Sequence, residues 1–219
     1  MTPLKRKQQT GATLLVALVL LAVVIVLTVT NMREVTLEGR MTANRAETQQ
    51  LQLAAESALR EAEKRFYDPG RVEEKLTEVP ENCRKSNVYT NLANRPCLIK
   101  LSDSENPDLS LHQEYQKNPL KFIANSAYLN NWTGDKTDKA SNTTSVPWMP
   151  YRGTSPGQTS TLENKAYWNA VLIPPEGLGA EYGSYQEGAG VAYYLITAQA
   201  DDRFALQSTI ANLYLGINN

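Results

Sequence analysis

The chain is poor in the residues from which most catalytic centres are built. Its 219 residues include one histidine and two cysteines, too few for a zinc site of the Cys₄, Cys₂His₂ or His₃ type. A cysteine–histidine nucleophile pair would require His112, and no family signature surrounds either cysteine. No general acid–base pair, nucleophile elbow or phosphate loop is recognisable. The sequence therefore predicts neither an enzyme nor a cofactor or metal site.

Excess charge of one sign is also lacking. The chain has 22 basic and 23 acidic side chains, a formal net charge of −1. Nucleic-acid binding depends on clustered positive charge, and no segment resembles a basic reading helix. We therefore expect no direct contact with nucleic acid.

Glycine and proline are nearly absent from one long stretch near the start. Between Ala12 and Phe66 the only such residue is Gly39, and Asp68-Pro69-Gly70 follows directly. Because proline and glycine end helices, residues 12–66 are predicted to form one continuous helix.

The first part of this helix is long and apolar enough to cross a membrane. From Ala12 to Thr30 no residue is charged, and only three threonines are polar. A span of this length crosses a hydrocarbon layer of about 30 Å. Basic residues precede it, at Lys5, Arg6 and Lys7, which places the amino terminus in the cytoplasm and the rest of the chain outside it.

The second part of the helix is amphipathic. Its apolar residues recur at steps of three and four and share one face: Leu51, Ala55, Ala58, Leu59, Ala62 and Phe66. We expect this narrow stripe to dock on the chain's own C-terminal domain, with a partner helix as the alternative. The helix is polar nearly all round between Met32 and Gln50, so that part is either solvated or buried only in an assembly.

Residues 67–219 are predicted to form an α+β globular domain. Strand signals cover residues 167–173, 191–200 and 205–215, with Asp201-Asp202-Arg203 as a hairpin connection. A weaker candidate strand is 98–101. Antiparallel strands that follow one long helix indicate an antiparallel sheet able to cover its apolar stripe.

Two cysteines, Cys83 and Cys97, lie in the part of the chain expected outside the cytoplasm. An oxidising compartment favours a disulfide between them, and closing a loop of about 15 residues would stabilise the fold by roughly 3 kcal/mol. Free thiols without a role are the alternative.

The segment 130–162 is rich in small and polar residues and is predicted to be a long surface loop. Its aromatic residues Trp132, Trp148 and Tyr151 either contact a partner or pin the loop to the core. Residues 103–108 carry oxygen ligands suited to calcium but lack EF-hand spacing, which favours a solvated acidic turn. Glycosylation sequons begin at Asn131 and Asn142 and are too short to be specific.

The amino terminus resembles a type IV prepilin. The residues that carry the resemblance are a short basic leader ending in Gly11, a small residue after it, and the uncharged stretch that opens a long helix. The resemblance implies that residues 1–11 are a leader peptide cut after Gly11 by a prepilin peptidase. It further implies an N-methylated Ala12 as the first mature residue, a transmembrane span at 12–30 and a pilin-like fold.

Two positions depart from a major pilin, in which the first and fifth mature residues are usually Phe and Glu. Here they are Ala12 and Val16. In the family the glutamate is thought to pair with the amino terminus of the subunit above. A carboxylate in a bilayer is costly without a partner, so a subunit with no neighbour above it has no need of one. The missing glutamate at Val16 thus suggests a tip or initiating position.

The segment 50–63 and the closing strands around 194–209 look like those of PilX/PilK-type minor pilins. The resemblance implies a non-enzymatic subunit that helps prime pilus assembly at the tip and supports adhesion and twitching motility. It implies an inner-membrane protein with a periplasmic domain that later enters the pilus. Expected partners are other minor pilins, the major pilin, the prepilin peptidase, the inner-membrane assembly platform and a tip adhesin. Alternatives are a tip pseudopilin of type II secretion, an uncleaved membrane-anchored periplasmic binding module, and, least favoured, a periplasmic hydrolase.

Overall fold

The computed structural model describes residues 12–68, 72–90, 94–101, 109–124, 146–173 and 189–215. The chain divides into two compact units, residues 1–47 and 48–219, and each is described by itself. The leader with Gly11, the acidic turn at 103–108, Trp132 and both sequons lie outside the described residues. The division falls within the predicted long helix, whose second half packs in the globular unit.

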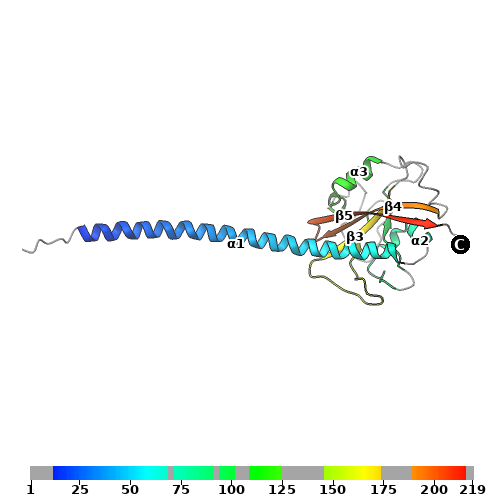
Figure 1. Cartoon of the computed structure of the whole chain (residues 1–219), viewed down its shortest axis with the longest axis horizontal. Helices are drawn as coiled ribbons and strands as arrows, with labels where there is room; N and C mark the ends of the chain where they lie inside the picture. Colours follow the sequence, from blue (N-terminus) through cyan, green and yellow to red (C-terminus); the bar gives the residue numbers. More distant parts are fainter. Residues whose placement is uncertain are drawn as a thin grey trace, which may run out of the picture. The chain divides into compact units, whose positions relative to one another are not determined.

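One helix, α1 (Ala12–Tyr67), links both units along the chain (Figure 1). The predicted helix at 12–66 is thus confirmed to within one residue. Two side chains of the globular unit donate hydrogen bonds to a carbonyl group at the end of α1. Lys75 Nζ donates to Phe66 O at 2.7 Å, and Asn212 Nδ2 donates to the same oxygen at 3.2 Å. The end of the helix therefore has the hydrogen-bond partners that the helix itself does not provide.

The second unit is built on one sheet with the strand order β1-β3-β4-β5, and β2 pairs with β3. The strands are β1 (Leu98–Ile99), β2 (Met149–Pro150), β3 (Ala166–Leu172), β4 (Ala189–Ala200) and β5 (Phe204–Leu215). All three strong strand predictions are confirmed, with small shifts at their ends. The β4–β5 hairpin turns at Asp201 and Asp202, which adopt positive φ angles of 48° and 58°. Aspartate tolerates this region better than most residues do.

The sheet is mainly antiparallel, as predicted, and one parallel pair makes it mixed. The β1 strand runs parallel to β3, with Leu98 opposite Ala170, whereas β2–β3, β3–β4 and β4–β5 are antiparallel. Parallel neighbours need a long crossover connection. Here that connection contains α3 (Leu109–Lys117) and α4 (Lys121–Ala124).

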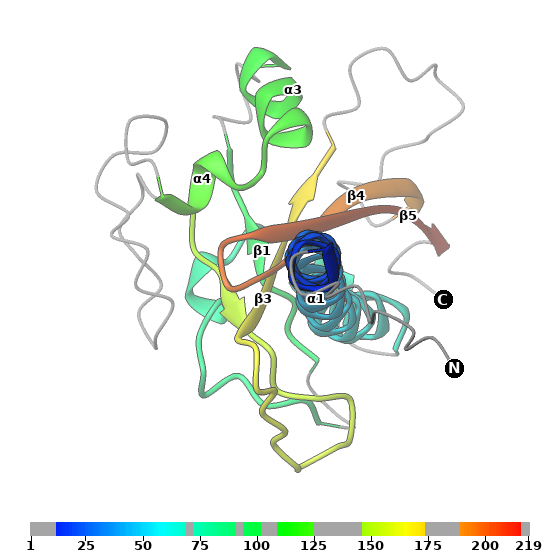
Figure 2. The same cartoon turned by 90° about the vertical axis from the view of Figure 1, so that its left-hand side faces the viewer.

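The two faces of the sheet are covered by different helices (Figure 2). The amphipathic part of α1 packs on one face, where the Phe66 ring lies 4.5 Å from the Tyr194 ring of β4. On the other face, Tyr115 of α3 donates a hydrogen bond to Asn169 of β3. Short segments α2 (Val72–Leu76) and η1 (Pro80–Asn82) follow α1.

The predicted alanine-rich stripe of α1 is the face that docks on the sheet. Ala55, Ala58 and Ala62 are fully buried, Leu51 and Phe66 nearly so, and Leu59 is half-buried against the core. Small side chains let the helix approach the strands closely. The stripe thus packs on the chain's own domain, and the partner-helix alternative for this face is excluded.

Candidate functional site: an exposed apolar helix

The first unit presents an apolar surface that no described part of the chain covers. Every large apolar side chain from Leu14 to Val29 is between 46% and 68% exposed. Leaving a side chain of this size in water instead of burying it costs about 1.5–3 kcal/mol. An uncovered surface of this extent is unfavourable in water, so this helix requires lipid or other protein around it.

Two of the three threonine hydroxyls in the apolar stretch bond to backbone carbonyl groups of their own helix. The Thr28 hydroxyl donates to the carbonyl oxygen of Val24 at 2.7 Å, and the Thr30 hydroxyl donates to that of Val26 at 3.0 Å. Moving such a hydroxyl into an apolar environment costs little free energy, because it keeps its hydrogen bond there. Among the described residues, α1 is the one helix long and apolar enough to cross a membrane.

Exposed apolar residues continue along α1 beyond the apolar span. They are 57–70% exposed and comprise Met32, Val35, Leu37, Met41 and Leu53. Of these, Leu53 lies in the second unit, on the helix face opposite the buried stripe. For residues 32–50 both alternatives, a solvated helix and a helix buried only in an assembly, stay predictions.

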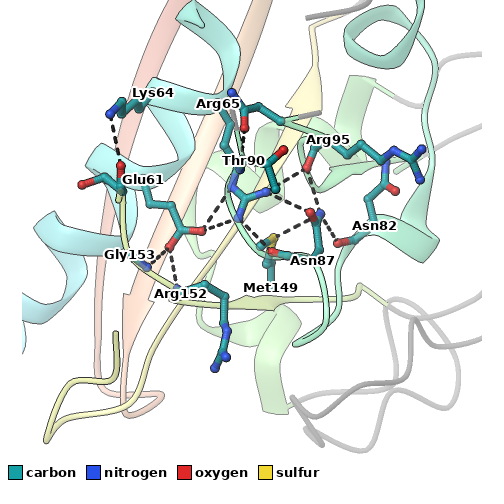
Figure 3. A network of polar contacts seen from close by, with 12 residues as sticks. Glu61, Lys64, Arg65, Asn82, Asn87, Thr90, Arg95, Met149, Arg152 and Gly153 are labelled. Atoms are coloured by element: carbon teal, nitrogen blue, oxygen red, sulfur yellow. Dashed lines mark hydrogen bonds and ion pairs between the residues drawn. The ribbon is translucent and has the colours of Figure 1, made fainter. Parts of the chain in front are cut away.

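A buried ion pair fixes the other half of α1 in the globular unit (Figure 3). Arg65 donates to Glu61 Oε1 from Nε at 3.1 Å and from Nη2 at 2.8 Å, and both side chains have no exposed surface. The second carboxylate oxygen, Glu61 Oε2, accepts from the backbone N–H groups of Arg152 and Gly153 at 2.7 and 3.1 Å. The pair thus joins α1 to the segment before β3.

The guanidinium of Arg65 also holds two loop segments. Its Nη1 donates to Asn87 Oδ1 at 3.0 Å and to the Arg95 carbonyl oxygen at 3.3 Å, and its Nη2 donates to the Asn87 carbonyl oxygen at 2.9 Å. The guanidinium carbon lies 5.8 Å from the ring centroids of both Tyr89 and Trp168. All these contacts come from one side chain, which makes Arg65 the centre of the packing between α1 and the loops.

Burial governs the titration of this pair. Desolvation raises the pKa of Glu61, while the Arg65 charge and the two backbone N–H groups act in the opposite direction. Desolvation likewise lowers the pKa of Arg65, and the Glu61 charge opposes that change. Each charge is therefore tolerated only because the other is present. In the sequence, the pair is visible only as Glu and Arg at i,i+4 beside the alanine stripe, which does not distinguish it from an exposed pair.

The remaining predicted site residues fall into three groups. Ala12 is the first residue of α1, and Val16 is 55% exposed on it. Cys83 and Cys97 form the predicted disulfide. Of the loop aromatics within the described ranges, Trp148 is buried in the core and Tyr151 packs against it half-buried, so these two side chains pin the segment to the core.

The part of the chain that the structure describes contains no cluster of three or more His, Cys, Asp or Glu side chains able to hold a metal ion. His112 lies half-buried on α3.

Comparison with models of protein families gives a match for the N-terminal part of the chain. The family model described as PilX N-terminal matches residues 10–60, which include the apolar surface and much of the docking stripe. No curated protein and no solved structure matches the chain significantly. A pilin family match points to a structural subunit rather than an enzyme. The N-terminal segment of the chain is therefore similar to that of PilX-type type IV pilins.

Proposed function

We propose that the protein is a minor pilin, a structural subunit that helps prime type IV pilus assembly at the pilus tip. The observation that carries this proposal is the uncovered apolar surface of α1, in a segment that matches the PilX N-terminal family. A filament subunit needs such a surface in two places. It anchors the subunit in the inner membrane first, and it packs against neighbouring helices in the filament afterwards.

Transfer between the two places is physically reasonable because the apolar surface stays dry in both. The globular unit would wait in the periplasm, where the Cys83–Cys97 disulfide is stable. The proposed partners are the major pilin, other minor pilins and the inner-membrane assembly platform. A tip adhesin is a further proposed partner, and adhesion and twitching motility would follow from the assembled pilus.

Val16 supports a position at the tip. It is the fifth residue after the proposed cleavage site and offers no carboxylate to the amino terminus of a neighbouring subunit above. A subunit that starts the filament has no neighbour there. The absence of this charge also removes a desolvation cost from the membrane-spanning part of α1.

Leader removal is the step that separates a pilin from an ordinary membrane anchor. We expect prepilin peptidase to cleave after Gly11 and Ala12 to become the N-methylated first residue. The test is intact mass and N-terminal sequencing of the full chain from cells with and without the peptidase. A chain that begins at methylated Ala12 only when the peptidase is present supports the proposal. A chain that still begins at Met1 makes the protein an uncleaved anchored module.

A Gly11→Ala variant sharpens this test. We expect it to stay uncleaved and outside the pilus while its globular unit remains folded. Gly39→Ala is the matched control, because nothing lies within 4 Å of the position its added Cβ would occupy, and it should be processed like the wild type. Equal processing of both variants would contradict the proposed cleavage site.

A further inference from the structure

The sheet of the globular unit has two very different edges. On one side, β3 is flanked by β1 and β2, which are two residues long each. On the other side lies β5, which is twelve residues long and pairs with β4 alone among the described strands. Short strands protect a sheet edge from further pairing, whereas a long regular strand leaves it open.

The sequence of β5 lacks the usual protection of an open edge. Natural edge strands carry lysines, other charges, prolines or bulges that prevent unwanted pairing. From Phe204 to Leu215 there is no charged residue, proline or glycine, although 21% of the whole chain is charged. The ladder to β4 is continuous over all twelve positions, without a bulge. The edge is thus a regular, neutral template.

The backbone groups that face this open edge can be assigned from the hydrogen bonds of the sheet. Ile173 N donates to the carbonyl oxygen of Tyr193, so the backbone of Tyr193 points toward β3. Because backbone direction alternates along a strand, the even-numbered residues of β4 point toward β5. They pair with the even-numbered residues of β5, such as Tyr194 with Ile210. The N–H and C=O groups of Thr209, Ala211 and Leu213 therefore point outward, and no described backbone group bonds them.

The side chains of the same residues are exposed. Thr209, Ala211 and Leu213 lie on the sheet face away from α1. Leu213 is 66% exposed and is the one exposed large apolar side chain outside α1 among the described residues. This row of neutral side chains beside unpaired backbone groups is suited to an added strand, with main-chain hydrogen bonds for affinity and alternate side chains for specificity.

We infer that the open edge of β5 accepts an extended, neutral β-strand from a different protein subunit. Only an extended backbone offers donors and acceptors at the spacing of a strand edge. A second copy of this chain is the alternative occupant, and the oligomeric state measured below distinguishes it from a different subunit. The inference goes beyond the proposed function and concerns a surface separate from the apolar helix.

The test uses the full chain in detergent micelles and a defined probe. The probe is a fluorescent peptide with the sequence of residues 191–200 and two added lysines at each end, because β4 is the strand that β5 already accommodates. Hydrogen exchange of the wild-type chain should show fast amides at Thr209, Ala211 and Leu213 and slow amides at Ser208 and Ile210. Saturating peptide should slow the fast amides about tenfold or more. Unchanged exchange at these amides would overturn the inference.

Proline variants test the same backbone groups. Ala211→Pro removes an outward N–H without disturbing the ladder to β4, and Thr209→Pro does the same one position away on that face. Losing one net hydrogen bond weakens binding by about tenfold, so each variant should weaken peptide binding by at least that factor. Ala211→Val keeps the N–H and should bind within about twofold of the wild type.

Two further outcomes count against the inference. If Ala211→Val weakens binding as much as Ala211→Pro, the side chain and not the open edge is responsible. If the wild-type chain forms a dimer that Ala211→Pro abolishes, the occupant is a second copy and not a different subunit. Light scattering of the same micelle preparations distinguishes the latter case.

Discussion

Replacing Glu61 by glutamine is expected to destabilise the globular unit strongly. The change keeps the shape of the side chain but removes its charge. Arg65, which has no exposed surface and bonds Glu61 at 2.8 Å, would then keep an uncompensated buried charge. Glutamine also has only one acceptor oxygen. In Glu61, one carboxylate oxygen accepts from Arg65, and the other accepts from two backbone N–H groups.

The expected loss is about 3–5 kcal/mol in the free energy of unfolding, the usual cost of breaking a buried ion pair by removing one partner. Because domains of this kind are stable by only about 5–15 kcal/mol in total, the variant should be close to unfolding at physiological temperature. Arg65→Met should cost at least as much, since it also removes the bonds to Asn87 and Arg95.

The same helix offers a matched control. Arg60 and Glu56 form an i,i+4 pair with the same residue types, at 3.6 Å and with 76% and 32% of their side chains exposed. Exposed pairs of this kind contribute about 0.3–0.5 kcal/mol. Glu56→Gln should therefore change the free energy of unfolding by no more than about 0.5 kcal/mol.

The assay is urea denaturation of the full chain in micelles, followed by tryptophan fluorescence, since Trp148 and Trp168 are buried in the globular unit. The double variant Glu61→Gln/Arg65→Met should lose less than the sum of the two single losses, because neither charge is then left alone. Equal effects of Glu61→Gln and Glu56→Gln would refute the reasoning. Strict additivity of the two buried changes would refute it as well.

The remaining predictions concern the disulfide and a buried lysine. Cys83→Ser/Cys97→Ser should lower the free energy of unfolding by about 3 kcal/mol on the chain-entropy account, measured by thermal denaturation; no change under oxidising conditions would contradict it. Burial lowers the pKa of Lys75 below 10.5, so its charged form favours the unfolded state. The free energy of unfolding of the wild type relative to Lys75→Met should therefore rise as the pH increases through the lowered pKa toward 10.5. If the difference in unfolding free energy between the two proteins did not change with pH in this range, burial would not lower the pKa of Lys75.

The long helix was predictable from the sequence, and so was its division into an apolar span and an amphipathic part that docks on the sheet. The uncharged stretch from Ala12 to Thr30 determines an apolar helix by length and composition alone. The alanine stripe determines which face docks, because residues at steps of three and four share a face whatever lies opposite. The strands and the cysteine pair were likewise visible, since β-branched runs, turn residues and the expected oxidising compartment are properties of the sequence itself.

What only the tertiary structure decided is how distant segments meet. The parallel β1–β3 pair depends on the path of the long crossover between them, which no local pattern specifies. Glu61 and Arg65 look in the sequence like any exposed i,i+4 pair, and the loops around Asn87 and Gly153 are what bury them. The open edge of β5 exists only because no other described strand pairs beside it. Local propensity sets the elements of this protein, and long-range packing sets which of their charges and edges remain available.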